Sequence, residues 1–158
     1  MLKYVAGDVL KAKELYIAQG VAEGNQEGLG TGLAYQISSR WPDVQVAFKK
    51  HARSGKFTAG EIFVVDPTEI RPGFVYLATQ PNMYNAKLNY LRRSLKRLYS
   101  WAEKNEIPSV AMPKIGAGLG KLDWSGEVKP LYEEYLSAGR CPQQIRQQYP
   151  VRIALTQP

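Results

Sequence analysis

Hydrophobic positions along the chain follow two spacings, one typical of β-strands and one typical of α-helices. Short apolar runs rich in β-branched and aromatic residues predict strands at 2–6, 15–18, 60–65, 74–79, 109–112 and 151–155. Between them, apolar residues recur every three or four positions, which predicts helices at 31–41, 44–53, 86–105 and 128–136 and a short polar helix near 143–148. Strands alternating with helices indicate an α/β fold. We expect one three-layer α/β/α domain over residues 1–158, with a mixed, mainly parallel central sheet.

Two glycine-rich stretches each stand between a predicted strand and a predicted helix. The first ends at Gly32 and is expected to begin at Gln19, directly after the strand at 15–18; the second is 116–120. Glycine has no Cβ and adopts positive φ, so successive backbone N–H groups can converge on one oxyanion near a helix N-terminus. Loops after the carboxyl ends of neighbouring parallel strands face the same side of a sheet. The two stretches therefore predict one crevice that holds a phosphate or a diphosphate.

Two aspartates stand at predicted element boundaries. Asp8 follows the first strand, and it is either a turn or helix-capping residue or a carboxylate that accepts a hydrogen bond from an exocyclic amine such as that of adenine. Asp43 precedes the predicted helix at 44–53, and we expect its side chain to cap that helix.

The charge balance favours anionic partners. The 158 residues include 21 Lys plus Arg and 14 Asp plus Glu, a net charge of +7, which suits a nucleotide, a nucleic acid or another acidic substrate. Basic side chains gather on the helices at 44–53 and 86–105. We interpret the basic face of the helix at 44–53 as solvated surface, with nucleic-acid contact as the alternative. The basic face of the helix at 86–105 is equally a solubilising face or a weak phosphate track.

Cysteine and histidine are too scarce for several kinds of chemistry. The single Cys141 excludes an intramolecular disulfide and a cysteine-based zinc site, and the single His51 argues against a histidine-rich metal site. We expect no metal and no cofactor. No apolar run approaches membrane-spanning length and the N-terminus lacks the pattern of a signal peptide, so we expect a cytoplasmic protein without a membrane partner.

Across nearly the whole chain the sequence resembles a macro domain, the ADP-ribose-binding fold. The resemblance rests on Gly7-Asp8 after the first strand, on the stretch 28–34 that opens a helix, on the loop at 116–120, and on their order. Residues 112–116 and 120–124 look most like the branch that contains the terminal ADP-ribose protein glycohydrolase and the antitoxins that remove ADP-ribose from DNA. Residues 32–36 also look like the ADP-ribose-1″-phosphate phosphatases.

This resemblance implies a site for ADP-ribose. It places adenine at Asp8, the diphosphate between the two glycine loops, and the distal ribose near Asn25 and Gly28. The ligand-binding residues that it implies are Asp8, Val9, Asn25, Gly28, Gly30, Thr31, Gly32, Gln80, Ile115, Gly116, Ala117, Gly118, Leu119 and Gly120.

The chain departs from the family at the positions that carry catalysis. In the glycohydrolase branch a lysine follows the strand-ending threonine and attacks the sugar, whereas Thr79 is followed here by Gln80, which cannot form a Schiff base. The protein glycohydrolase has an aspartate where this chain has Gly120, although the DNA-directed antitoxins have glycine there. Asp123 is expected to cap the next helix. Lys121 is the nearest lysine in sequence, and we expect it to pair with the diphosphate or to point into solvent. The catalytic residues therefore stay unknown at this stage.

Three functions remain open. The favoured one is an enzyme that releases ADP-ribose from a modified macromolecule or a small derivative, using bound water and the ligand's own phosphate instead of a protein nucleophile. The second is a non-catalytic ADP-ribose reader, which the residues do not separate from the first. The third is a nucleic-acid-binding module, and phosphatase action on ADP-ribose-1″-phosphate is a further alternative.

Overall fold

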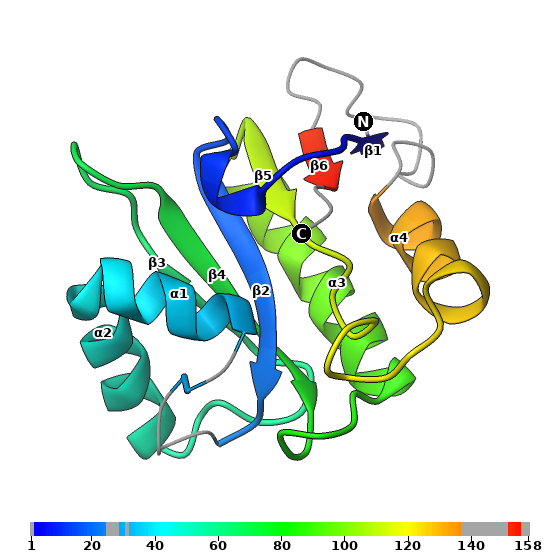
Figure 1. Ribbon diagram of the computed structural model, residues 1–158, viewed down its shortest axis with the longest axis horizontal. Helices are drawn as coiled ribbons and strands as arrows, with labels where there is room; N and C mark the ends of the chain where they lie inside the picture. Colours follow the sequence, from blue (N-terminus) through cyan, green and yellow to red (C-terminus); the bar gives the residue numbers. More distant parts are fainter. Residues whose placement is uncertain (1, 25–28, 31, 137–151, 156–158) are drawn as a thin grey trace.

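The structure is a computed structural model that describes residues 2–24, 29–30, 32–136 and 152–155 (Figure 1). Its strands form a six-stranded sheet in the order β1-β6-β5-β2-β4-β3. The strands are β1 (Leu2–Tyr4), β2 (Tyr16–Ala22), β3 (Ile62–Val65), β4 (Gly73–Gln80), β5 (Ser109–Met112) and β6 (Arg152–Leu155). Every neighbouring pair is parallel except β3–β4. The mixed, mainly parallel sheet expected from the sequence is confirmed.

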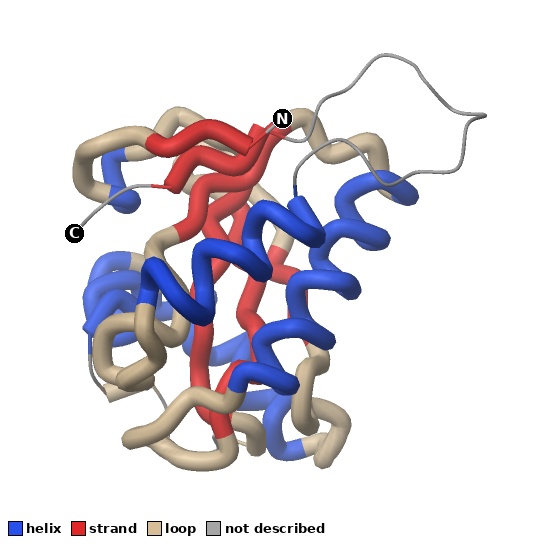
Figure 2. The backbone as a smooth tube through the Cα atoms, turned by 90° about the vertical axis from the view of Figure 1, so that its right-hand side faces the viewer, coloured by secondary structure: helices blue, strands red, loops and turns tan. Residues whose placement is uncertain are grey.

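Helices cover both faces of this sheet. They are α1 (Gly32–Arg40), α2 (Pro42–Arg53), α3 (Leu88–Lys104) and α4 (Lys129–Leu136), with a 3-10 turn η1 (Val9–Lys11) and a π-helical turn η2 (Trp124–Val128). Leu91, Leu95 and Leu98 of α3 share one apolar cluster with residues of α4. Figures 1 and 2 show these two helices side by side on one face of the sheet. Ile37 of α1 and Phe48 of α2 pack on the other face. The two apolar clusters give the three-layer α/β/α architecture.

Strand β2 is longer than the sequence predicts. The expectation that a loop begins at Gln19 is wrong, because Gln19 and Gly20 are in register with Tyr76 and Leu77 of β4 and the strand continues to Ala22. A Cβ on Gly20 would lie 2.6 Å from both Thr79 Oγ1 and Ile115 Cγ2. Glycine here serves the close approach of β2 to its neighbours, and turn formation begins only after Ala22.

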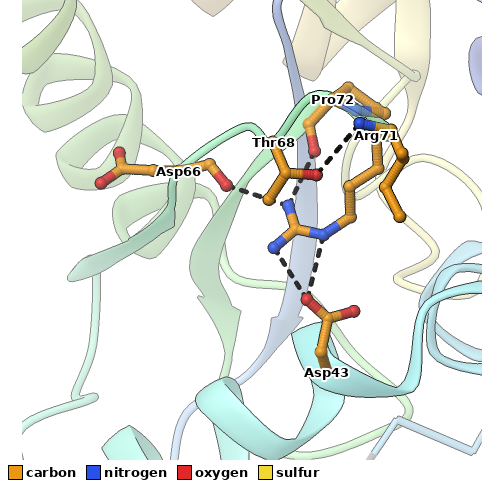
Figure 3. Close-up of polar contacts among 6 residues, drawn as sticks. Asp43, Asp66, Thr68, Arg71 and Pro72 are labelled. Atoms are coloured by element: carbon orange, nitrogen blue, oxygen red, sulfur yellow. Dashed lines mark hydrogen bonds and ion pairs between the residues drawn. The ribbon is translucent and has the colours of Figure 1, made fainter.

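Asp43 does not cap α2, which corrects a second expectation. The helix begins at Pro42, and its N-cap residue Trp41 makes no side-chain capping bond. Asp43 Oδ2 instead accepts hydrogen bonds from Arg71 Nη2 at 2.9 Å and from Arg71 Nε at 3.1 Å (Figure 3). Arg71 Nη1 donates to the carbonyls of Asp66 and Pro72. Because the Arg71 side chain is only 7% exposed, this contact ties the β3–β4 connection firmly to α2.

The remaining elements follow the sequence closely. The predicted long helix at 86–105 is α3, and the neighbouring strands expected at 60–65 and 74–79 are β3 and β4. The helix expected near 143–148 lies outside the described residues. Within the described part of the chain, no helix combines the length and the apolar character needed to cross a bilayer.

Candidate functional site

A cavity of about 650 Å³ opens at the carboxyl ends of β2 and β4 and beside the loop that follows β5. Its volume suits a nucleotide-sized ligand. It is lined by Gln19, Gly20, Val21, Ala22, Leu29, Gly30, Gly32, Leu33, Ala34, Thr79, Gln80, Met83, Pro113, Lys114, Ile115, Gly116, Ala117, Gly118, Leu119, Gly120 and Trp124. Both glycine-rich stretches therefore border one cavity, as the strand order required.

The first glycine stretch leads into α1 at the edge of the cavity. Gly32 has φ +58° and is the first residue of α1, so the N-terminus of that helix stands beside the cavity. A Cβ on Gly32 would lie 3.5 Å from Leu119 Cδ1, which shows that the two glycine stretches approach each other. Asn25, Gly28 and Thr31, which the resemblance assigns to ligand binding, lie outside the described residues.

The second glycine stretch presents unused backbone donors. Gly116 has φ +82°, and its carbonyl accepts a hydrogen bond from the N–H of Leu122 at 2.8 Å. Between described residues, no hydrogen bond uses the N–H of Gly116, Gly118, Leu119 or Gly120. Consecutive unpaired N–H groups beside a cavity form a receptor for an anion. This geometry suits the phosphate or diphosphate that the glycine pattern predicts.

A buried tyrosine fixes the start of that loop. Tyr132 of α4 donates its hydroxyl hydrogen to the carbonyl of Pro113 at 2.8 Å, and its oxygen accepts from the N–H of Ile115 at 2.9 Å. Burial raises the pKa of Tyr132 above its ordinary value, so the hydroxyl keeps its proton and both hydrogen bonds persist. The loop that borders the cavity is therefore held by α4.

Lys114 gives the cavity its charge. Among the described residues that line it, Lys114 carries the one charged side chain, and no carboxylate is present. Lys114 Nζ lies 5.1 Å from the centre of the Trp124 ring, and that ring meets Tyr132 edge to face at 5.3 Å. Cation–π contact holds the ammonium beside the cavity. Sequence reasoning missed Lys114, although it stands only two residues before the second glycine stretch.

Lys121, the lysine considered from the sequence, stands elsewhere. It is exposed, it has φ +64°, and it is absent from the residues that line the cavity. Its exposure and its absence from the cavity lining agree with the solvent alternative of the sequence analysis.

The end of β4 places two polar residues at the cavity. Thr79 is fully buried, and its Oγ1 has no hydrogen-bond partner among the described residues. Gln80 lines the cavity, and its carbonyl accepts a hydrogen bond from the N–H of Glu23 at 2.8 Å. The residue that replaces the lysine of the glycohydrolase branch is thus located at the site, as a neutral amide.

Both remaining aspartates of the sequence analysis act as helix caps. Asp8 Oδ1 accepts from the N–H of Leu10 at 2.9 Å at the start of η1, and Asp8 and Val9 do not line the cavity. Val9 is buried in the core beside α1 and α2. Adenine binding by Asp8 stays a prediction. Asp123 Oδ2 accepts from the N–H of Gly126 at 2.6 Å, which confirms the expected cap of the following turn.

Comparison with known proteins agrees with this geometry. The profile of the Macro domain family matches residues 21–129. The chain is 33% identical over 129 residues to a DNA ADP-ribosyl glycohydrolase of Mycobacterium tuberculosis, a match that covers 78% of this chain and 36% of that protein. It is 28% identical to an ADP-ribose glycohydrolase of Homo sapiens, covering 87% of this chain and 85% of that one. The chain thus spans little more than a third of the bacterial relative.

Solved structures share the whole arrangement. The macrodomain of Thermus aquaticus DarG superposes with a TM-score of 0.83 at 27% identity, and the match covers 100% of this chain and 99% of that one. The macrodomain of Mycobacterium tuberculosis DarG gives a TM-score of 0.78 at 26% identity, with 100% and 97% covered. From its sequence match, its sheet order and its two glycine loops around one cavity, we conclude that this chain belongs to the macro domain family.

Proposed function

We propose that this protein binds ADP-ribose in the cavity and hydrolyses it from a modified macromolecule or a small derivative, without a lysine nucleophile. The observation that carries the proposal is the loop 116–120: between described residues, four of its N–H groups make no hydrogen bond, and the described lining of the cavity that it borders includes one cation and no carboxylate. A diphosphate needs such donors and tolerates no facing carboxylate. The names of the relatives, which are glycohydrolases acting on ADP-ribosylated DNA or on ADP-ribose derivatives, support the hydrolytic reaction.

The proposed reaction uses water directly. The bond between C1″ of the distal ribose and the attached group breaks, and the oxygen of a water molecule bonds to C1″. The ligand's own phosphate takes the proton of that water, and the departing group leaves with a proton from solvent. Backbone N–H groups and Lys114 hold the diphosphate, which fixes the position of the sugar relative to Gln80. Gln80 orients water or sugar through its amide, because an amide is neutral and barely nucleophilic.

The attached group is proposed to be a nucleic acid. The net charge of +7 favours an anionic carrier, and several relatives are named for DNA. The non-catalytic reader and the ADP-ribose-1″-phosphate phosphatase are not favoured, because the relatives with matching sequences are named glycohydrolases.

The experiment offers the protein two substrates, an ADP-ribosylated single-stranded oligodeoxynucleotide and an ADP-ribosylated peptide, and follows ADP-ribose release by mass spectrometry. Calorimetry with ADP-ribose and with AMP runs beside it. We expect release from the oligonucleotide and tighter binding of ADP-ribose than of AMP, because AMP lacks the second phosphate and the distal ribose. Tight ADP-ribose binding without release from either substrate would identify a reader, and equal affinity for the two nucleotides would contradict the diphosphate site.

A further inference from the structure

Exposed apolar side chains gather at one side of the cavity mouth. Met83 and Leu119 both line the cavity, yet these residues are 46% and 64% exposed, and the neighbouring Tyr84 is 70% exposed. Single exposed apolar residues are ordinary on protein surfaces. Three large ones beside the opening of a ligand cavity form a surface that a ligand larger than ADP-ribose would cover. Segment 82–87, which carries Met83 and Tyr84, is called the lip below.

The lip is held in place from both ends and from within. Asn82 Oδ1 accepts hydrogen bonds from the N–H groups of Tyr84 at 2.9 Å and Asn85 at 3.1 Å. The N–H of Ala86 donates to the carbonyl of Gly120 at 2.9 Å, so the lip lies against the second glycine loop. The N–H of Lys87 donates to the carbonyl of Thr79 at 3.0 Å. These contacts fix the backbone that presents the Tyr84 ring, which lowers the entropic cost of stacking on it.

Two exposed lysines, one at the end of the lip and one on the adjoining glycine loop, add positive charge to this surface. Lys87 and Lys121 each follow one partner of the Ala86–Gly120 hydrogen bond, so they stand on adjoining backbone, and both are exposed. Two carboxylates on adjoining segments accept hydrogen bonds within the protein, Asp123 from the N–H of Gly126 and Glu23 from the hydroxyl of Tyr90. Alongside these two carboxylates, the surface around Tyr84 presents an aromatic ring and two cations, the pair of features that binds single-stranded nucleic acid.

We propose that the lip binds the single-stranded nucleic acid that carries the ADP-ribosyl group. A base next to the modified nucleotide stacks on Tyr84, Met83 and Leu119 extend the apolar contact to the cavity, and Lys87 and Lys121 attract the backbone phosphates. A duplex hides its base faces in the stack and an unmodified peptide has no phosphates, so neither matches this surface. The inference rests on the proposed function, because it requires ADP-ribose in the cavity.

The test measures how much tighter ADP-ribose binds when it is attached to a nucleic acid than when it is free. Stopped-flow anisotropy, which records binding before release, is applied to free ADP-ribose, to a single-stranded oligodeoxynucleotide with one ADP-ribosyl group, and to a peptide with one such group. We expect the oligonucleotide to bind about tenfold tighter than free ADP-ribose, as one stacked base and two lysines allow. Added salt should reduce this gain.

Variants assign the gain to the lip. Tyr84→Ser should remove most of it and leave the affinity for free ADP-ribose unchanged, whereas Tyr84→Phe should keep it because the ring remains. Ile70→Ser is the matched control: Ile70 is 88% exposed and lies in the β3–β4 connection, at the opposite end of β4 from the cavity. Ile70→Ser should leave the affinities for free ADP-ribose and for the ADP-ribosylated oligonucleotide unchanged.

Each other result has a defined meaning. A wild-type protein that binds the oligonucleotide no tighter than ADP-ribose, or equal losses in Tyr84→Ser and Ile70→Ser, would overturn the inference and leave the proposed function standing. An equal gain with the peptide would assign the lip to protein carriers and also overturn it. Failure to bind free ADP-ribose would refute the proposed function itself.

Discussion

Replacing Lys114 by methionine should weaken ADP-ribose binding about 30-fold. An ammonium and a phosphate charge about 5 Å apart attract by about 3 kcal/mol at an effective dielectric constant of about 20. Lys114 is partly exposed, and water competes for its ammonium. We therefore take about 2 kcal/mol, which corresponds to about 30-fold in Kd. Methionine keeps an unbranched apolar stem beside Trp124, so the cavity wall should persist.

Lys121→Met supplies the matched control for this experiment. It removes the same charge from the other end of the same loop, but Lys121 is exposed and does not line the cavity. Calorimetry with ADP-ribose should give a Kd within twofold of wild type for K121M. Adenosine has no phosphate, so both variants should bind it with the affinity of the wild type. Equal losses in both variants would mean that general surface charge attracts the ligand, and the assignment of Lys114 to the diphosphate would be wrong.

Further predictions concern the glycine loop, the adenine contact and the reaction. Gly118→Val should weaken ADP-ribose binding strongly, because its side chain would stand where the backbone must approach the phosphates. Its melting temperature should stay near wild type, because a Cβ at Gly118 meets nothing within 4 Å. Gly120→Val should instead lower the melting temperature, because its Cβ would lie 2.7 Å from Ala86 Cβ. Asp8→Ala should cost about 1–3 kcal/mol of binding to ADP-ribose but not to its hypoxanthine analogue, and equal losses by calorimetry would remove Asp8 from the adenine site. Borohydride added during turnover should trap no lysine adduct in the wild-type protein. Gln80→Lys introduces the amine that such trapping needs. Detection of a reduced ADP-ribosyl adduct on the wild-type protein by mass spectrometry would refute the direct attack of water.

The sequence predicts the elements well and the side-chain partnerships poorly. Glycine at 20 reads as the start of a turn, and only the pairing of β2 with β4 shows that it belongs to a strand. Asp43 stands where a capping residue is expected, yet its partner Arg71 is 28 residues away in the sequence. A local sequence pattern does not predict such a long-range contact. The same holds at the site. The glycine spacing predicts the loop that borders the cavity, but the choice between Lys114 and Lys121 depends on which way the turn directs each side chain.

The hydroxyl of Tyr132 sets a lower limit on the length of a fragment that retains this binding site. The family match ends at residue 129, yet the hydrogen bonds that hold Pro113 and Ile115 come from Tyr132 in the next turn of α4. A fragment cut at the family boundary would lose the hydroxyl that links the Pro113 carbonyl to the Ile115 N–H, and with it the edge-to-face partner of Trp124. Shortened versions made for screening or for fusion to other proteins should therefore keep all of α4, which ends at Leu136, and also β6, which pairs with both β1 and β5.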